Sequence, residues 1–410
     1  MEDVWEFQMI VSDHMFGKIN FVGRIVFLPI FYGLFLFACS EGGNGSVDSI
    51  DSQSYLKDSL ILKIDAKSSY DFNYFDIGRV DEIEQLVILN QVNSSIDFYS
   101  LKDGNLEKRF NVPQDGPTPV RNTQGILFYN QDSIFVFTAY LLSRFGLFDS
   151  DRELISLHRP EVDSDNPRDK IHNQSSAPSM PTVYLKGKLY FSHLTMGNPP
   201  GNPKFSESHH PEFLYYLEKD SVVQIDHLKM PAEYSGSTMP LSFSLHSKAL
   251  NDLDEFVISW YASDSLFVYD LDFNLKSVHL GKSSLAKGFE KTTYPLSKEE
   301  SDRLTISQTH YPRLIYDPHR RLYYRFAFIG RTYNPSELID YKSTLKNPFS
   351  IIVLDDSFKK LEEILFPGST YNLYQAFIAE YGLYLPKTNI FYTNLDEDKV
   401  KYEIFDFSSL

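Results

Sequence analysis

The sequence predicts an all-β fold that follows an N-terminal export leader. Aromatic residues make up 15% of the 410-residue chain, with 33 Phe and 27 Tyr, which favours strands over helices. Short alternating or apolar runs, separated by turn-forming residues, recur from Leu60 to the C-terminus. An apolar run behind basic residues stands near the N-terminus, as it does in exported proteins.

The leader is the most specific of these signals. Residues Ile25–Phe37 are almost wholly apolar and follow Lys18 and Arg24. The run is shorter than the roughly 20 residues that a membrane span needs. It ends in Leu36-Phe37-Ala38-Cys39, which resembles the lipobox of bacterial lipoproteins, where cleavage precedes a cysteine that receives lipid. The alternative is a short buried strand that ends in Ala-Cys by chance.

Cysteine usage agrees with lipidation. Cys39 is the only cysteine of the chain, so no disulfide can hold the fold, and thiol catalysis is excluded once Cys39 carries lipid. Ser40 directly after the cysteine resembles outer-membrane sorting. We therefore predict an outer-membrane lipoprotein of the cell envelope, facing the periplasm or the cell surface.

The predicted organisation has three parts. Residues 1–38 form the signal peptide, residues 39–58 a lipidated flexible tether rich in Ser, Gly, Asp and Asn, and residues 59–410 one β domain. Acidic residues near the start are unusual in a signal peptide, so translation from Met15 is an alternative. The formal net charge of −16 argues against nucleic acid as a partner and against docking of the domain itself on anionic lipid. The membrane is instead reached through the lipid on Cys39.

An internal repeat defines the unit of the domain. Leu86–Leu101 (LVILNQVNSSIDFYSL) aligns without gaps on Phe256–Leu271 (FVISWYASDSLFVYDL). Each segment predicts a strand, a polar turn and a second strand, and a third strand follows both. Repetition at this wide spacing indicates a propeller or a repeat array.

When the length and strand order of this unit are applied along the sequence, the chain divides into six groups of predicted strands. The first two comprise Phe72–Ile77, Gln85–Asn90, Ser95–Leu101 and Leu106–Val112, then Gly125–Tyr129, Ser133–Ala139, Arg144–Asp149 and Glu153–His158. The next two comprise Thr182–Leu185, Lys188–Leu194, Glu212–Leu217 and Ser221–His227, then Ser242–His246, Glu255–Tyr261, Ser265–Leu271 and Leu275–Leu280. The last two comprise Arg313–Asp317, Leu322–Ile329, Ser350–Leu354 and Lys360–Phe366, then Leu373–Ala379, Gly382–Pro386 and Lys401–Phe407.

The sixth group lacks one strand, and the unassigned strand Leu60–Asp65 can pair beside Lys401–Phe407 to close a ring. The sequence therefore predicts a six-bladed β-propeller of four-stranded blades. A pair of β-sandwiches or a β-helix explains neither the fourfold grouping nor the extra strand. Short helices are expected where Ser297 and Glu300 have the spacing of a capping box, and at Asn334–Glu337.

Several segments resemble one bacterial family. These are the lipobox, the LVILNQVNSSIDFYSL unit, the segment from Tyr316 to Arg325 and the segment Glu380–Tyr384. Together they resemble the Gram-negative lipoproteins of domain of unknown function 4221, over roughly Leu60 to Phe407. The resemblance implies a propeller-like fold and an envelope location, and it supplies no activity or catalytic residues.

The predicted loops differ between the two ends of the propeller. Nearly all long connections fall on the end that leads from one blade into the next: Arg159–Pro181, Thr195–Pro211, Lys229–Leu241, Gly281–Pro312 and Gly330–Phe349. Long ordered loops at one end of a rigid scaffold are the usual place for recognition.

Six residues of this end are candidate ligand contacts. Arg121, His310, Arg313 and Arg331 lie near the ends of predicted inner strands and would suit a carboxylate or a sulfated sugar, although pairing with the many acids is an alternative. Tyr311 and Tyr371 could stack on a sugar ring, with core packing as the alternative.

His193, His209 and His210 are weak candidates for metal ligands, since their spacing matches no common metal motif, and we predict neither a metal nor a cofactor. No catalytic motif is present. The sequence thus favours a non-enzymatic lipoprotein whose loop-bearing end binds a small molecule, a glycan or a protein. The alternatives are an envelope hydrolase or lyase that acts on a glycan or peptide in the funnel, and a structural subunit of an envelope complex.

Overall fold

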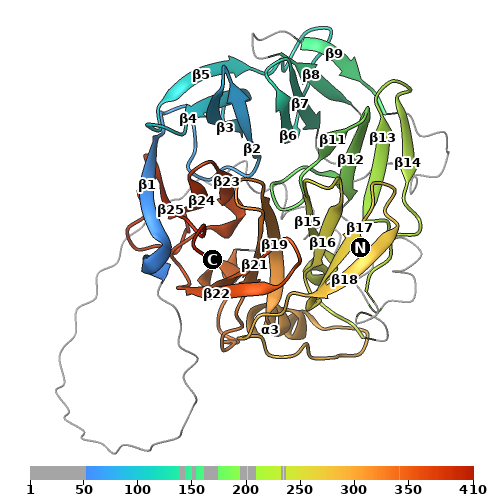
Figure 1. Ribbon diagram of the computed structural model, residues 1–410, viewed down its shortest axis with the longest axis vertical. Helices are drawn as coiled ribbons and strands as arrows, with labels where there is room; N and C mark the ends of the chain where they lie inside the picture. The colour runs from blue at the N-terminus through green and yellow to red at the C-terminus, as the bar shows by residue number, and fades with distance from the viewer. Residues whose placement is uncertain are drawn as a thin grey trace, which may run out of the picture. The chain divides into compact units, whose positions relative to one another are not determined.

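The computed structural model describes residues 52–138, 144–149, 154–160, 174–193, 201, 209–231, 234, 237–340 and 342–410. They belong to one compact unit that runs from Ile50 to Leu410. Six antiparallel sheets follow one another around a central axis, which is the arrangement of a six-bladed β-propeller (Figure 1). The predicted fold class is confirmed. The predicted signal peptide, with Cys39 and most of the tether, lies outside the described residues.

Each sheet forms one blade, and its strands follow the chain from the axis outward, except that β1 is outermost in blade six and β10 and β11 both pair with β12 in blade three. Blades one and two comprise β2 (Phe75–Val80), β3 (Ile83–Asn90), β4 (Ser95–Ser100) and β5 (Leu106–Asn111), then β6 (Thr123–Asn130), β7 (Ser133–Thr138), β8 (Phe145–Phe148) and β9 (Leu154–His158). Blade three comprises β10 (Gln174–Ser175), β11 (Val183–Leu185), β12 (Lys188–His193), β13 (Glu212–Tyr216) and β14 (Ser221–Gln224). Blade four comprises β15 (His246–Leu250), β16 (Phe256–Trp260), β17 (Ser265–Tyr269) and β18 (Leu275–Leu280). Blades five and six comprise β19 (His310–Asp317), β20 (Leu322–Phe328), β21 (Phe349–Leu354) and β22 (Lys360–Phe366), then β23 (Phe377–Ala379), β24 (Gly382–Pro386), β25 (Lys399–Phe405) and β1 (Leu56–Lys63).

Blade six takes its outer strand from the beginning of the described chain. A single 3-10 turn, η2 (Ser52–Tyr55), leads into β1, which pairs antiparallel with β25 from Leu56 opposite Phe405 to Lys63 opposite Lys399. Backbone hydrogen bonds therefore join the two ends of the domain inside one sheet.

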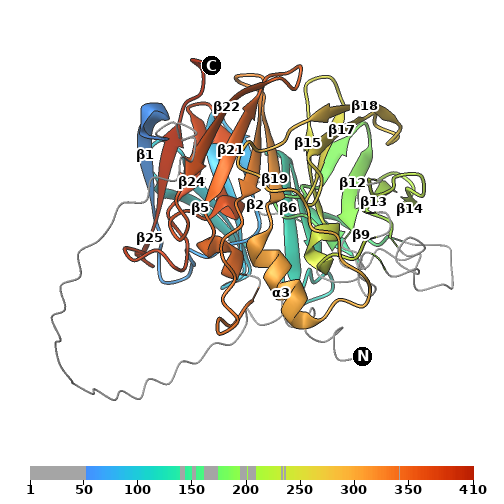
Figure 2. The same cartoon turned by 90° about the horizontal axis from the view of Figure 1, so that it is seen from below.

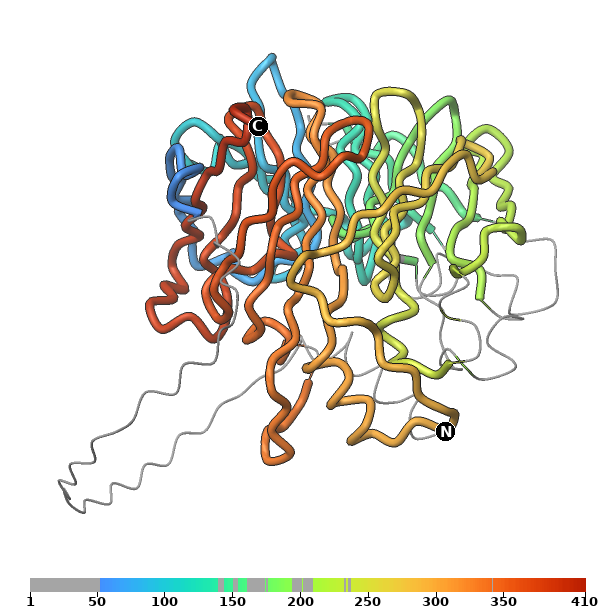
Figure 3. The backbone as a smooth tube through the Cα atoms, turned by 60° about the horizontal axis from the view of Figure 1, so that its bottom comes forward, coloured from blue at the N-terminus to red at the C-terminus, as the bar shows by residue number. Residues whose placement is uncertain are grey.

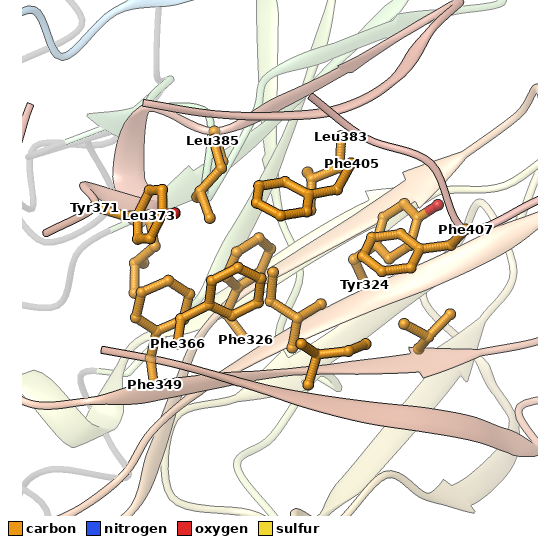
Figure 4. Close-up of a cluster of buried hydrophobic side chains, with 14 of the residues drawn as sticks. Tyr324, Phe326, Phe349, Phe366, Tyr371, Leu373, Leu383, Leu385, Phe405 and Phe407 are labelled. Atoms are coloured by element: carbon orange, nitrogen blue, oxygen red, sulfur yellow. The ribbon is translucent and has the colours of Figure 1, made fainter. Parts of the chain in front are cut away.

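The core consists of apolar layers between neighbouring blades. Between blades five and six, Phe326, Phe349 and Phe366 face Leu383 and Phe405 (Figure 4). The rings of Phe366 and Phe405 meet edge-on, with centroids 5.3 Å apart. Edge-to-face aromatic pairs add to the free energy of burial and favour one geometry, so these layers fix the angle between blades.

A buried arginine connects blades four and five. Arg325 on β20 is fully buried, and its guanidinium donates to the carbonyl oxygens of Ser263 at 2.6 Å and Gly281 at 2.8 Å. Its central carbon lies 3.7 Å from the centroid of the Tyr311 ring. Burial lowers the pKa of Arg325 to about 10, so the side chain stays charged at neutral pH and needs these acceptors.

The predicted inner strand of blade four is wrong in its bounds. The segment expected as strand Ser242–His246 is mostly a 3-10 helix, η5 (Leu241–Ser244), and β15 lies at His246–Leu250 instead. Its sequence, HSKAL, looks polar, yet His246 and Lys248 are buried because both contact Glu212 of blade three. A pattern of apolar residues could not show a strand that is buried through ion pairs.

The other departures are local. The expected strand Leu373–Ala379 splits into η7 (Leu373–Gln375) and β23, and the first expected strand begins three residues late, as β2. The helix α3 (Lys298–Ser307) forms with the expected cap, since the Ser297 side chain accepts from the Glu300 amide. At Asn334–Glu337 only a turn forms, and the 3-10 helix of this loop is η6 (Ser343–Lys346). In the described part of the chain no helix combines the length and apolar character of a membrane span.

The two ends of the propeller differ in their connections. At one end, here called the tight-turn face, strands are joined by short turns such as Lys186-Gly187 and 355–359. At the other, called the loop-rich face, stand the long segments 281–309, which contains α3, and 329–348. Figure 2 shows α3 at one end of the sheets and the C-terminus at the other, and Figure 3 shows the same asymmetry in the backbone.

Candidate functional site

A polar network lies at the loop-rich end of blade one. Asp97 of β4 is 1% exposed and is the acceptor at its centre. Its carboxylate accepts from Ser95 at 2.6 Å, from Asn90 at 2.8 Å and from Ser68 at 3.3 Å. Arg109 of β5, directly opposite in the sheet, donates to it from Nε at 2.7 Å and from Nη2 at 2.8 Å. The network therefore spans three elements: the β3–β4 hairpin, strand β5 and the loop 64–74.

The same arginine also holds the loop that enters blade one. Arg109 donates from Nη1 to Asp65 at 2.7 Å and from Nη2 to Ser68 at 2.6 Å. These hydrogen bonds to Arg109 lower the pKa of Asp65 to about 2, so this half-exposed carboxylate is ionised at every physiological pH. The guanidinium is thereby fixed between two carboxylates.

Two hollows flank this network. A narrow pocket of about 40 Å³ lies between blades six and one, lined by Leu62, Val400 and Tyr99 together with Asn90 and Asp97. It has room for roughly three water molecules. A wider, open hollow of about 430 Å³ is lined by Lys67, Asn93, Arg109, Phe110 and Asn111. Only the second hollow has the volume of a site for a small organic ligand.

The internal repeat shows that these polar residues are not required by the blade. In the gap-free alignment Asn90 and Asp97 stand where blade four has Trp260 and Phe267. The cross-strand pair Asp97–Arg109 occupies the register position of Phe267–Val278. The same supersecondary unit is thus built with apolar residues in one blade and with charged ones in another. This comparison within the sequence could have revealed the network, which our sequence analysis missed.

The structure does not bring the six predicted ligand contacts into one site. His310, Tyr311 and Arg313 share β19 and are all buried. The Tyr311 hydroxyl donates to Asp264 at 2.7 Å, and the Arg313 guanidinium donates to the carbonyl oxygens of Leu373, at 2.7 Å, and Ala376. Burial lowers the pKa of Arg313 to about 9.

The remaining three lie elsewhere on the loop-rich face. The exposed Arg121 pairs with Asp115 at 2.7 Å, and Arg331 pairs with Glu337 at 2.8 Å. Tyr371 is buried and donates to Glu403 at 2.5 Å. All six side chains thus have contacts inside the protein, and ligand binding by them stays a prediction.

A second polar cluster lies at the loop-rich end of blades three and four. The Glu212 carboxylate lies 2.6 Å from the Lys248 ammonium and 2.7 Å from His246 Nε2, and it accepts a hydrogen bond from Ser192 at 2.8 Å. Glu212, Lys248 and His246 are at most 2% exposed. Burial alone would raise the pKa of Glu212, but Lys248 and His246 outweigh it and the pKa is lowered. The cluster is an enclosed triad of polar side chains that joins the two blades.

The three candidate metal ligands lie beside this triad without forming a centre. His209 is 4% exposed and packs toward Trp260, and burial lowers its pKa to about 3. His193 bonds through Nδ1 with the His210 carbonyl, and His210 contacts Gln224 and Asp226. In the residues that the structure describes, no three His, Cys, Asp or Glu side chains gather in a geometry that could hold a metal ion.

We expect Asp97→Ala to lower the free energy of unfolding by about 3 kcal/mol, because four donors would lose a buried acceptor. Asp115→Ala is the matched control: its carboxylate is 92% exposed and pairs with Arg121, so the loss should stay below about 0.5 kcal/mol. Urea denaturation of both variants measures the difference. Similar small losses in both would contradict the description of Asp97 as the centre of a network.

His310 makes the stability of the fold sensitive to acid. It lies among Phe243, Tyr261 and Phe328, and burial lowers its pKa to about 4. The unfolded chain binds this proton near pH 6.5 and the folded chain only near pH 4, so stability falls as pH decreases through that window. At pH 5 this one residue should cost about 2 kcal/mol relative to pH 8.

We therefore expect His310→Phe, which fits the aromatic surroundings, to reduce the loss of unfolding free energy between pH 8 and pH 5 by about that amount. Denaturant titrations at both pH values test this. An unchanged difference between the two pH values would show that His310 is accessible to protons in the folded state.

Comparison with solved structures supports the propeller fold. The chain resembles in structure a member of the DUF4221 family from Bacteroides vulgatus, with 20% identity, a TM-score of 0.72, and coverage of 86% of this chain and 97% of that one. Weaker likenesses are to a Bacteroides fragilis protein named as a candidate exported protein (13% identity, 88% and 98% coverage, TM-score 0.48) and to virginiamycin B lyase from Staphylococcus aureus (8% identity, 85% and 99% coverage, TM-score 0.43). None of the curated proteins matches the sequence. The sequence profile of the domain of unknown function DUF4221 matches residues 50–365, and this chain belongs to that family.

Proposed function

We propose that this protein is a non-catalytic binding lipoprotein of the outer membrane, anchored through Cys39, whose loop-rich face receives a ligand or a partner. The observation that carries the proposal is the opposition of the two faces. The loop-rich face bears the long segments and both hollows, and the chain that leads to Cys39 enters at the tight-turn face.

The position of β1 supports the entry of the chain at the tight-turn face. Leu56 pairs with Phe405, at the tight-turn end of blade six, and the Asp406 amide donates to the Tyr55 carbonyl at 2.9 Å. Lys57 and Asp406 form an ion pair at 2.9 Å at the same place. The described chain therefore begins at the end of the domain opposite the loop-rich face, so a tether attached here does not cover that face.

The tight-turn face is further occupied by contacts between blades. Lys186 of blade three pairs with Asp254 of blade four at 2.6 Å. Arg320 of blade five donates to the Glu380 carbonyl of blade six at 3.1 Å, and the Glu380 amide donates to Glu84 of blade one at 2.9 Å. These contacts connect neighbouring turns around the axis, which suits a supporting face better than a recognition face.

The buried Glu212–His246–Lys248 triad is the observation that favours the alternative, an envelope hydrolase or lyase. A carboxylate, an imidazole and an ammonium in contact could move protons. Their complete enclosure leaves no surface for a substrate, however, and the ion pairs account for their burial. Binding without catalysis is therefore the function that the geometry supports best.

We expect Cys39→Ser to move the protein from the membrane fraction to the soluble fraction while its melting temperature stays unchanged, because Cys39 precedes the described domain. Fractionation of cells that produce each form, with detection of the protein in both fractions, measures this. A variant that stays in the membrane fraction would contradict anchoring by lipid.

The binding face can be tested by attaching a bulky polymer at one introduced thiol, because Cys39 is the only native cysteine. In a Cys39→Ser background, Val92→Cys and Leu338→Cys place the polymer on the loop-rich face, and Leu253→Cys, with 71% exposure, is the matched control on the tight-turn face. Retention of the protein on immobilised envelope extract should fall at least tenfold for a polymer at Val92 or Leu338 and should change little for one at Leu253. Loss only with the Leu253 variant, or no retention of any form, would overturn the proposal.

A further inference from the structure

We propose that the open hollow at the rim of blade one is a binding site for a neutral, polyhydroxylated ligand, that is, a saccharide unit. The hollow is the one lined by Lys67, Asn93, Arg109, Phe110 and Asn111. The inference rests on the proposed function, since it names the ligand class for one site on the loop-rich face.

The wall of the hollow is rigid. Arg109 is fixed by Asp97 and Asp65, and the Ser95 hydroxyl oxygen lies 2.6 Å from both Asn93 Oδ1 and Asp97 Oδ1, which share its single proton. A polar group held in place loses little conformational entropy when a ligand binds, which raises affinity for a given contact. Arg109 and Asn93 are therefore pre-formed, and Lys67 lies on the loop 64–74, which Arg109 holds through Asp65 and Ser68.

Two polar groups at the hollow remain available to a ligand. Among the described residues, neither the Lys67 ammonium nor the Asn111 amide has a hydrogen-bond partner, and both side chains are exposed. An ammonium donates, and an amide both donates and accepts. Asp65, with 46% of its side chain exposed, adds an acceptor at the edge. Sugar hydroxyls, which donate and accept, match this combination.

The charges favour a neutral ligand over an anion. Lys67 and Arg109 are balanced by Asp65 and Asp97, and the hydrogen bonds from Arg109 keep Asp65 ionised. An anionic group would have to displace Asp65 from the guanidinium or approach that carboxylate at close range, where like charges repel. A hydroxyl-rich ligand meets no such penalty.

Blade four shows that the fold alone does not account for the charged pair. Phe267 and Val278 fill the register position of Asp97 and Arg109 in an otherwise matching unit. Replacing an apolar pair by a buried ion pair is often neutral or costly for stability. The polar side chains of blade one therefore call for an explanation other than stability, and recognition of a polar ligand supplies one.

The experiment is isothermal titration of the full-length lipoprotein, in a detergent without a sugar headgroup, with a panel of neutral trisaccharides built from glucose, mannose, galactose or N-acetylglucosamine. Inorganic sulfate and glucuronate serve as anionic probes. The test variant is Lys67→Ala/Asn111→Ala, and the matched control is Lys287→Ala, an exposed lysine of the same face that also lacks a partner in the described chain.

We expect at least one neutral trisaccharide to bind, with Kd raised at least tenfold in Lys67→Ala/Asn111→Ala and changed less than twofold in Lys287→Ala. Equal melting temperatures of the three forms show that folding is intact. The inference is overturned if no trisaccharide binds, if the double variant binds as the native chain does, or if sulfate or glucuronate binds more tightly through the same two residues. The proposed function is tested separately. If the protein still binds envelope extract and a polymer at Val92 blocks that binding, the loop-rich face binds a ligand of another class.

Discussion

The structure depends on one constraint: each blade has apolar side chains on both faces and is stable only between two neighbours. Strand β3 shows this directly, because Leu86 and Ile88 pack toward blade six while Val87 and Leu89 pack toward blade two. A row of such sheets has an uncovered face at each end, whereas a ring has none. The pairing of β1 with β25 places the first and last strands in one sheet, so the ring is held by backbone hydrogen bonds.

This constraint explains how arginines can be buried without a carboxylate. Arg325 and Arg313 donate to carbonyl oxygens at the strand ends and connecting segments of the neighbouring blade, across the blade interfaces. A buried cation that satisfies several carbonyl oxygens at once compensates part of its desolvation penalty. Arg313 and Tyr311, two of the six predicted ligand contacts, thus belong to the contacts between neighbouring blades.

The fold could be predicted from the sequence because its periodicity is strong. Alternation of apolar residues and the match between Leu86–Leu101 and Phe256–Leu271 gave the number of blades and most strand positions. The bounds of strand β15 were not predicted, because its residues are buried through contacts with Glu212, which no local sequence pattern reveals. The short strand β10 was not predicted, because two residues are too few to show a periodic pattern.

The candidate site could not be predicted by residue type and loop length alone. Asp97 lies within a strand, where an acidic residue looks like a solvated position, and its partners Ser68 and Arg109 come from separate elements. Only the position-by-position comparison of blade one with blade four marks it, since an Asp stands where the repeat has a Phe.

The location of the open hollow also bears on the size of its ligand. Arg109, Phe110 and Asn111 belong to β5, the outermost strand of blade one, so the hollow lies at the rim and away from the axis. A funnel on the axis is surrounded by six blades and admits a small molecule or the end of a chain. A hollow at the rim is open to the side, so that a polymer bound through one unit can continue in both directions.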